Sequence, residues 1–306
     1  MIPREPISPP SRVILYPRED GLAAYAATAS AAKWLIEHGV EVLIDADVLA
    51  RSGWDGLGLP EQVIGVELDA LPKDVDLMIA LGGDGTLLRA SRWVADLGVP
   101  VLGVNLGDLG FLSAYSREQL LDALRDAIEG RLYWEPRLRM AVEVRRQGQL
   151  FATETAVNDV YIKHGQIPRL LRLDTRAGDQ PLALYKADGL IVSTPLGSTA
   201  YNLAAGGPIV APGTWVFTIT PICPHSLTLR PVVVSARDGV TVIFAGPSGE
   251  TDAYLSADGQ WQIGLELGDE IRMSAAETPL RLVPAHASVF QVLTAKLGWS
   301  GPGNGG

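Results

Sequence analysis

The sequence predicts an α/β N-terminal domain with a parallel sheet, followed by an all-β C-terminal domain. Helical and strand-like segments alternate over residues 1–136, which is typical of βαβ units with parallel strands. Residues 137–285 instead show the period-two hydrophobicity of antiparallel strands, and helical patterns are scarce there. We therefore expect a boundary within "YWEPRLR", residues 133–139.

The elements of the first domain follow one another as strands and helices. The expected strands are 12–17, 40–46, 75–83 and 99–105, and the expected helices are 21–39, 86–98 and 116–130. The strand at 75–83 is a nearly continuous apolar run, as in a strand buried on both faces of a parallel sheet. The last helix begins with Ser116 and Gln119 at the spacing of a capping box.

The second domain reads as a series of hairpins. Two are expected over residues 139–157, turning at Gln147-Gly148, and over 170–185, around "AGDQ". A third is expected on Asp238-Gly239, since Asp-Gly between apolar runs favours a tight turn. Residues 253–276 contain two further short strand pairs.

The two ends of the chain are expected to differ. Residues 1–11 contain four prolines and are expected to be disordered. The segment 286–306 contains a predicted helix over 287–299 and is expected to return to the first domain before a glycine-rich tail.

Composition narrows the functional classes. The 306 residues carry a net charge of −10, which disfavours nonspecific binding to nucleic acid or anionic membranes. A single cysteine fits a reducing compartment, no apolar run is long enough to span a membrane, and no signal peptide is visible. We expect a cytoplasmic protein, in which a local amide site could still hold a small anion.

The segment Gly82-Gly83-Asp84-Gly85-Thr86 lies between the strand at 75–83 and the next helix. It matches neither a P-loop nor G-x-G-x-x-G, yet a phosphate site belongs at this end of a parallel strand. Asp84 could simply cap the helix. Three glycines around one acid are more than a cap needs, which favours a site where the carboxylate positions a hydroxyl or a hydrated metal ion.

Two further segments are candidates for ligand contact, one of them in a crevice shared with Asp84. "GVNLGDLGFLS", residues 103–113, ends at the same sheet edge, although alone it is more typical of a loop in which Asn105 and Asp108 bond their own backbone. Asn158-Asp159 is either a turn or a pair that presents an amide and a carboxylate to ribose hydroxyls or an adenine edge.

The most unusual stretch is residues 185–212. Hydroxyl side chains crowd around Gly197, namely Ser193, Thr194, Ser198 and Thr199. Small residues at 204–207 permit close backbone approach, and Tyr201 offers a stacking face. The apolar strand "LIVST" that breaks into this loop favours a binding surface, and the alternative is a tight structural crossing of backbone segments, which uses the same residues. The histidines are expected to be structural, and no metal-ligand spacing is present.

Taken together, these motifs resemble the bacterial and archaeal NAD kinases. The resemblance is carried, in order, by "GGDGTLLRA", "VNLGDLGFL", "VND", "DGLIVSTPLGSTAYNLAAGGPIV" and "TPICPHSLTLRP". GGDGT alone is shared with diacylglycerol and sphingosine kinases and, in a close form, with 6-phosphofructokinases. "GSTAYNLAAGGP" and "PICPHSL" are much more specific to NAD kinases.

The resemblance implies ATP-dependent phosphorylation of the adenosine ribose 2′-hydroxyl of NAD, with Asp84 as proton acceptor. It implies a divalent metal ion, expected to be Mg²⁺ carried by ATP, and assembly as a homodimer or homotetramer in which a neighbouring subunit supplies parts of a site. The implied NAD- and nucleotide-binding residues are Gly83, Gly85, Thr86, Arg89, Asn158, Asp159, Arg169, Lys186, Asp188, Thr199, Ala200, Tyr201, Asn202, Leu203, Ala204 and Gln260.

The chain departs from the family pattern at two positions. Leu196 stands where the family usually has threonine, and His164 stands where many members carry arginine. The alternative functions are a lipid kinase of the diacylglycerol kinase type and a noncatalytic NAD or NADP sensor. The sequence leaves open whether ATP, another triphosphate or polyphosphate is the donor, and whether NAD or NADH is preferred.

Overall fold

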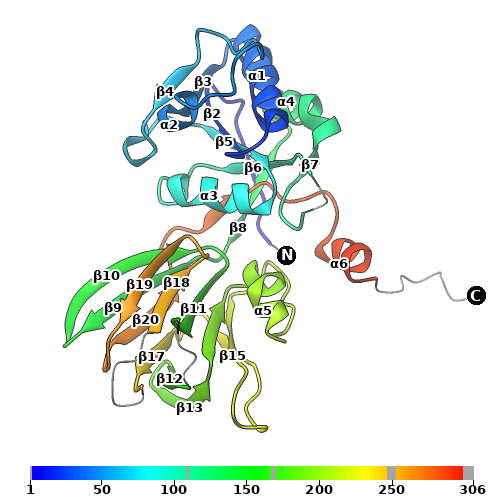
Figure 1. Ribbon diagram of the computed structural model, residues 1–306. Coiled ribbons are helices and arrows are strands. Elements are labelled where there is room, and N and C mark those ends of the chain that lie inside the picture. The colour runs from blue at the N-terminus through cyan, green and yellow to red at the C-terminus, as the bar shows by residue number, and fades with distance from the viewer. Residues whose placement is uncertain (1, 108–109, 167–169, 247–252, 299–306) are drawn as a thin grey trace, which may run out of the picture. The chain divides into compact units, whose positions relative to one another are not determined.

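The computed structural model describes residues 2–107, 110–166, 170–246 and 253–298. The chain forms two compact units, residues 1–136 with 280–306 and residues 137–279. The first unit is an α/β unit with a mostly parallel sheet, and the second is built from antiparallel sheets (Figure 1). The predicted fold class is thereby confirmed.

The sheet of the first unit has the strand order β1-β8-β21-β6-β5-β2-β3-β4, with β7 paired to β6. Strands β2, β3, β4, β5, β6, β7 and β21 pair in parallel. Their bounds are β1 Glu5–Pro6, β2 Arg12–Pro17, β3 Glu41–Asp45, β4 Ile64–Val66, β5 Leu77–Gly82, β6 Val101–Asn105, β7 Tyr115–Ser116, β8 Tyr133–Arg137 and β21 Leu280–Leu282.

Helices cover both faces of this sheet. Their bounds are α1 Leu22–Glu37, α2 Ala46–Leu49, η1 Leu68–Ala70, α3 Asp84–Val94, η2 Arg117–Gln119, α4 Leu120–Ile128 and α6 Val289–Leu297. Leu35 of α1 and Leu124 of α4 share one apolar core with Leu15 and Leu102 of the sheet. Helix α3 packs on the opposite face, because a β-carbon at Gly103 would lie 2.5 Å from Leu87 Cδ1, and Gly103 alternates with Leu102 along β6.

Both ends of the chain join this unit. Strand β1 lies in the proline-rich start, for which we expected disorder, and pairs with β8 while Ile7 is buried. Strand β21 pairs with β6, so the return to the first unit begins at residue 280, before the expected 286. Helix α6 forms where the sequence predicted one, and Gly298 ends it in the left-handed conformation.

The second unit contains two six-stranded antiparallel sheets, with orders β10-β9-β20-β17-β12-β13 and β16-β15-β14-β11-β18-β19. The bounds are β9 Met140–Arg146, β10 Gln149–Ala156, β11 Asp159–His164, β12 Leu171–Ala177, β13 Gln180–Ala187, β14 Gly189–Ser193, η3 Gly197–Thr199, α5 Tyr201–Ala204, β15 Val216–Ile222, β16 Val232–Ser235, β17 Val240–Phe244, β18 Ala253–Ala257, β19 Trp261–Leu265 and β20 Glu270–Ala275. Alternate residues of both sheets meet in one apolar core.

Two predicted hairpins are confirmed and one is wrong. Strands β9 and β10 pair across Gln147-Gly148, and β12 pairs with β13. The hairpin on Asp238-Gly239 does not form, because β16 pairs with β15 whereas β17 pairs with β12 and β20 in the other sheet. Within residues 253–276, β18 and β19 pair with each other, but β20 pairs with β9 and β17, so only one of the two expected strand pairs is local.

Candidate functional site

Asp84 is the first residue of α3 and follows directly on the end of β5. Gly83, not Asp84, occupies the N-cap position. The Asp84 carboxylate turns to the loop after β6, where Oδ2 accepts the Phe111 N–H at 2.8 Å and Oδ1 accepts the Leu112 N–H at 3.2 Å. The capping interpretation is therefore wrong, and the two loops at this sheet edge meet at one carboxylate.

The glycines of the motif serve different purposes. A β-carbon at Gly82 would lie 2.3 Å from Thr86 Oγ1, so Gly82 permits the tight passage from strand to helix. A β-carbon at Gly83 or Gly85 would meet no atom of the described residues within 4 Å. Gly110 approaches from the neighbouring loop, where a β-carbon would lie 2.2 Å from Asp84 Oδ1. Asp84 is thus held from one side, while the α3 N-terminus borders open space.

Arg89 lies on the exposed side of α3, one turn beyond the motif. Its guanidinium is 2.9 Å from the Glu19 carboxylate in the loop after β2, and Arg51 is 3.3 Å from the same carboxylate. The predicted binding residue Arg89 therefore belongs to a cluster that connects α3 with the segments after β2 and α2. Helix α6 also reaches this edge, with Lys296 Nζ 4.6 Å from the Phe111 ring.

In the second unit, Asn158 and Asp159 are positioned by Asp258, a residue that the sequence analysis did not single out. The Asp258 carboxylate accepts the backbone N–H groups of Val157 at 2.8 Å, Asn158 at 2.7 Å and Asp159 at 3.1 Å. The Asp258 N–H donates back to the Asp159 carbonyl at 2.9 Å. The signal was present in "ADGQ", from which we had taken only Gln260.

Two side chains of this turn carry buried oxygen atoms that can still accept hydrogen bonds. Asn158 Oδ1 is buried and has no hydrogen-bond partner among the described residues. Asp159 is 4% exposed, and burial together with the nearby Asp258 charge raises the pKa of its carboxyl group to about 7. Buried acceptors without partners are uncommon in folded proteins. Both side chains can therefore accept hydrogen bonds from the hydroxyl groups of a ligand.

The hydroxyl-rich stretch, for which the sequence favoured a binding surface, is mostly a structural crossing. Ser193, Thr194 and Ser198 are fully buried and donate to backbone carbonyls, Thr194 Oγ1 to Val157 O at 2.6 Å and Ser198 Oγ to Pro195 O at 2.7 Å among them. A β-carbon at Gly197 would lie 2.1 Å from the Asn158 carbonyl. These residues therefore fix the backbone of η3 against the Asn158-Asp159 turn.

Asn202 is likewise committed within the protein. Its amide nitrogen donates to Ser198 O and Pro208 O, both at 3.1 Å, and its Oδ1 accepts from Thr218 at 3.0 Å and Thr220 at 2.7 Å. All four hydrogen-bonding positions of this fully buried side chain are used. Asn202, predicted as a binding residue, thus orients the loop that carries its neighbours.

The other predicted residues of this loop are more accessible. Thr199, Ala200, Tyr201 and Leu203 are partly exposed and Ala204 is exposed. The Tyr201 ring lies edge-on to Tyr161, with 5.3 Å between centroids. Tyr201 therefore keeps exposed ring surface on the side of the sheet that bears Asp159.

The remaining predictions are placed as follows. Lys186 is exposed on β13, and its carbonyl accepts the His225 N–H at 2.9 Å. The Asp188 carbonyl accepts the His164 N–H at 3.3 Å, and the Asp188 N–H donates to the Ile222 carbonyl at 3.0 Å. Gln260 is exposed in the turn that contains Asp258.

The remaining sequence expectations concern Arg169, Leu196, metal ligands and membrane spans. Arg169 lies outside the described residues. The Leu196 side chain is buried, so this departure from the family pattern contributes to packing. In the described part of the chain, no group of three His, Cys, Asp or Glu side chains could hold a metal ion, and no helix is long and apolar enough to cross a membrane.

Comparison with known proteins identifies both units. Residues 15–132 match the family model described as the ATP-NAD kinase N-terminal domain, and residues 157–285 match the ATP-NAD kinase C-terminal domain. The chain is 39% identical over 267 residues to an NAD kinase of Geobacter sulfurreducens, covering 87% of this chain and 90% of that protein. It is 41% identical over 260 residues to an NAD kinase of Moorella thermoacetica, covering 85% and 80%.

Solved structures show the same architecture. A yeast NADH kinase in complex with NADH is 26% identical and superposes with a TM-score of 0.84, covering 97% of this chain and 89% of that one. An NAD kinase from Archaeoglobus fulgidus in complex with ATP is 24% identical, with a TM-score of 0.68 over 95% of this chain and 99% of that one, a likeness of fold.

Proposed function

Since the chain belongs to the ATP-NAD kinase family, we propose that it transfers the γ-phosphoryl group of ATP to the 2′-hydroxyl of the adenosine ribose of NAD, forming NADP, with Asp84 as the proton acceptor. The observation that carries the role of Asp84 is its geometry. Its carboxylate is fixed by two backbone amides beside an open helix N-terminus. A helix N-terminus favours negatively charged phosphate groups.

The chemistry of phosphoryl transfer fits a fixed carboxylate. The transition state is loose, so catalysis depends mainly on positioning and on charge stabilisation. A ribose hydroxyl is a weak acid and a carboxylate is a weak base. Asp84 therefore orients the hydroxyl and accepts its proton as the new phosphorus–oxygen bond forms.

We assign NAD recognition to the second unit. Asn158 Oδ1 and the Asp159 carboxyl group are buried acceptors suited to ribose hydroxyls, and Tyr201 supplies a ring surface for a base. Asp258 fixes the backbone of Asn158 and Asp159, and Asn202 fixes the loop that carries Tyr201. Lys186, Asp188, Thr199, Gln260 and Arg169 stay predicted contacts, which the resemblance alone supports.

Magnesium enters this reaction as part of the substrate MgATP. Mg²⁺ usually keeps several waters and binds through substrate phosphates, so the ion is expected to arrive on the triphosphate. Assembly as a homodimer or homotetramer and a cytoplasmic location remain part of the proposal.

The direct test is incubation with NAD, ATP and Mg²⁺, with NADP as the expected product. Asp84→Asn should lower kcat by about 10² to 10⁴, because the amide cannot accept the proton and its NH₂ group faces one of the two backbone N–H groups that hold the carboxylate. Calorimetry should still detect NAD and MgATP binding. Asp122→Asn, at an exposed aspartate of α4 that pairs with Arg125, is the matched control and should keep the native rate.

Three outcomes would contradict the proposal. A native rate for Asp84→Asn would remove the proton-acceptor role. Phosphorylation of diacylglycerol but not of NAD would identify a lipid kinase. NAD binding without any turnover would identify a sensor.

A further inference from the structure

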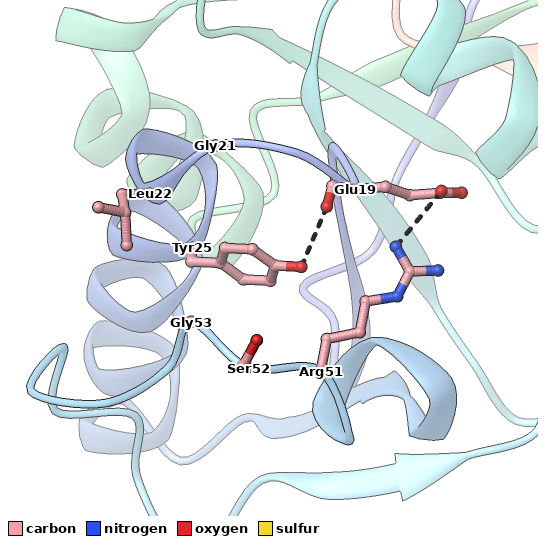
Figure 2. Close-up of a pocket in the computed structure, with 7 residues that line it drawn as sticks. All are labelled: Glu19, Gly21, Leu22, Tyr25, Arg51, Ser52 and Gly53. Atoms are coloured by element: carbon pink, nitrogen blue, oxygen red, sulfur yellow. Dashed lines mark hydrogen bonds and ion pairs between the residues drawn. The ribbon is translucent and has the colours of Figure 1, made fainter.

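A pocket of about 620 Å³ lies in the first unit, outside the residues assigned so far (Figure 2). Glu19 and Gly21 line it from the loop between β2 and α1, Leu22 and Tyr25 line it from α1, and residues 51–53 line it from the segment after α2. The volume falls in the range of small-molecule sites. The pocket is therefore large enough for a nucleoside.

The polar groups of the pocket centre on Glu19. Its carboxylate pairs with Arg51 at 3.3 Å, and its carbonyl accepts the Tyr25 hydroxyl at 3.2 Å (Figure 2). The same carboxylate pairs with Arg89 at 2.9 Å. Asp45 also lies within electrostatic reach of Glu19 and Arg51, so the two guanidinium groups stand beside two carboxylates and the cluster carries no net charge. The pocket thus combines an acceptor for hydroxyl groups with guanidinium groups that can donate to phosphates.

Apolar surface completes the pocket. Leu22 is 68% exposed at the start of α1. The Tyr25 ring is fixed by an edge-on contact with Trp54, with 4.4 Å between centroids. Leu22 lies opposite the Arg51 guanidinium across the pocket (Figure 2). A flat base can pack against the leucine and stack on the guanidinium, so the pocket suits a heterocycle.

The pocket lies at the same edge of the sheet as Asp84. Strand β2 pairs in parallel with β5, and the Arg18 N–H after β2 donates to the Leu81 carbonyl of β5 at 2.8 Å. Arg89, on the helix that Asp84 begins, reaches Glu19 on the pocket wall. Arg89 and Glu19 therefore connect the pocket with α3, at whose N-terminus we proposed that the phosphate groups bind.

We propose that this pocket binds the nucleoside part of the phosphoryl donor, with Arg51 and Glu19 contacting base and ribose and Arg89 contacting the phosphate chain. The proposal rests on the phosphoryl transfer proposed above and adds where the donor lies. It also predicts an answer to a choice that the sequence left open, because a site for base and ribose would favour a nucleoside triphosphate over inorganic polyphosphate.

Two substitutions test the pocket. Ser52→Trp fills it from an exposed position, and Arg51→Gln removes its guanidinium. Arg125→Gln is the matched control, because Arg125 is a similarly exposed arginine that pairs with a carboxylate, Asp122, at 3.2 Å. Calorimetry measures the binding of MgATP, magnesium tripolyphosphate and NAD, and the NADP assay measures the KM for ATP.

Each pocket variant should weaken MgATP binding by about tenfold or more, the loss expected when a charged hydrogen bond or a filled contact disappears. Binding of tripolyphosphate and NAD should stay at the native level, and Arg125→Gln should resemble the native protein. Unchanged MgATP affinity in both pocket variants, or equal losses for MgATP and tripolyphosphate, would overturn the assignment.

The readouts separate this proposal from the proposed function. If the native protein forms NADP but the pocket variants keep native ATP affinity, the pocket assignment fails and the activity stands. If no NADP forms but the variants selectively lose MgATP, the pocket stands and the proposed reaction fails. If the native protein does not bind MgATP, the pocket assignment is wrong.

Discussion

The turns that carry Asp84 and Asp159 use aspartates in opposite ways. In the first unit, backbone amides of one loop position a side chain, since Phe111 and Leu112 donate to the Asp84 carboxylate. In the second unit, a side chain positions backbone amides, since the Asp258 carboxylate accepts three consecutive N–H groups of residues 157–159. The Asp159 carboxyl group itself accepts no hydrogen bond from the described residues and is almost fully buried.

This difference indicates a division of labour. A carboxylate held at both oxygens keeps one position and suits a step that demands alignment of the reacting atoms. A buried carboxyl group that lacks protein partners suits recognition, because a ligand hydroxyl can satisfy it. Disturbing the first turn should therefore lower kcat, whereas disturbing the second should raise the KM for NAD.

Among substitutions that leave both aspartates in place, the largest effect is expected from Gly110→Ala. The new β-carbon would lie 2.2 Å from Asp84 Oδ1, so the carboxylate must move although its chemistry is unchanged. A displacement of about 1 Å can cost about 10² in rate, and we expect kcat to fall by that factor while the KM for NAD stays native. Steady-state kinetics of NADP formation measure both values.

Gly107→Ala is the matched control in the same loop. A β-carbon at Gly107 would meet no described atom within 4 Å, so the native rate is expected. Equal kcat losses in the two variants would show that the loop needs glycine flexibility. The proposed reason, that Gly110 leaves room for the Asp84 carboxylate, would then be wrong.

A smaller effect is expected from Asp258→Asn in the second unit. The substitution replaces an accepting oxygen by an NH₂ group that faces backbone N–H groups, and the Asn158-Asp159 turn should loosen. We expect the KM for NAD to rise about ten- to hundredfold, with kcat and the KM for ATP little changed. The kinetic constants for both substrates decide the result.

Asp238→Asn provides the comparison for this variant. Asp238 is an exposed aspartate before a glycine in the same unit, and it should tolerate the change. If Asp258→Asn lowers kcat and leaves the KM for NAD unchanged, the second turn does not serve recognition and the contrast between the two turns fails.

Local patterns predicted those parts of the fold that local interactions decide. Alternating strands and helices, the turn at Gln147-Gly148 and the helix after residue 286 all depend on neighbours in sequence. The partners of β17 could not be predicted, because Asp238-Gly239 specifies a turn and not the sheet in which the next strand pairs. The pairing of β1 with β8 likewise depends on a strand more than 120 residues away.

The same limit applies to the sites. The motif around Asp84 was visible because strand, glycines and helix are contiguous. Its contact with Phe111 and Leu112, and the clamp from Asp258 about a hundred residues beyond Asn158, exist only in three dimensions. Composition could not separate ligand-facing hydroxyls from structural ones either, because Ser193, Thr194 and Ser198 have the polarity of binding residues and are buried in the crossing.

The smallest expected effect is a pH dependence that only the second turn should show. Burial and the Asp258 charge raise the pKa of Asp159 to about 7, so its carboxyl group is mostly protonated at pH 6 and mostly ionised at pH 8. The ionised form accepts more hydrogen bonds from ribose hydroxyls, so NAD binding should favour it. NAD affinity should therefore rise with pH, with roughly tenfold weaker binding at pH 6 than at pH 8.

Asp159→Asn isolates this titration, because it keeps the shape of the side chain and removes the ionisable group. Calorimetric NAD affinity of the variant should be nearly constant between pH 6 and pH 8. In Asp258→Asn the midpoint of the pH dependence should move to lower pH, because one of the two causes that raise the pKa of Asp159 is lost. A pH profile that is identical in the native protein and in Asp159→Asn would assign the titration to another group, and Asp159 would then bind NAD in a single protonation state.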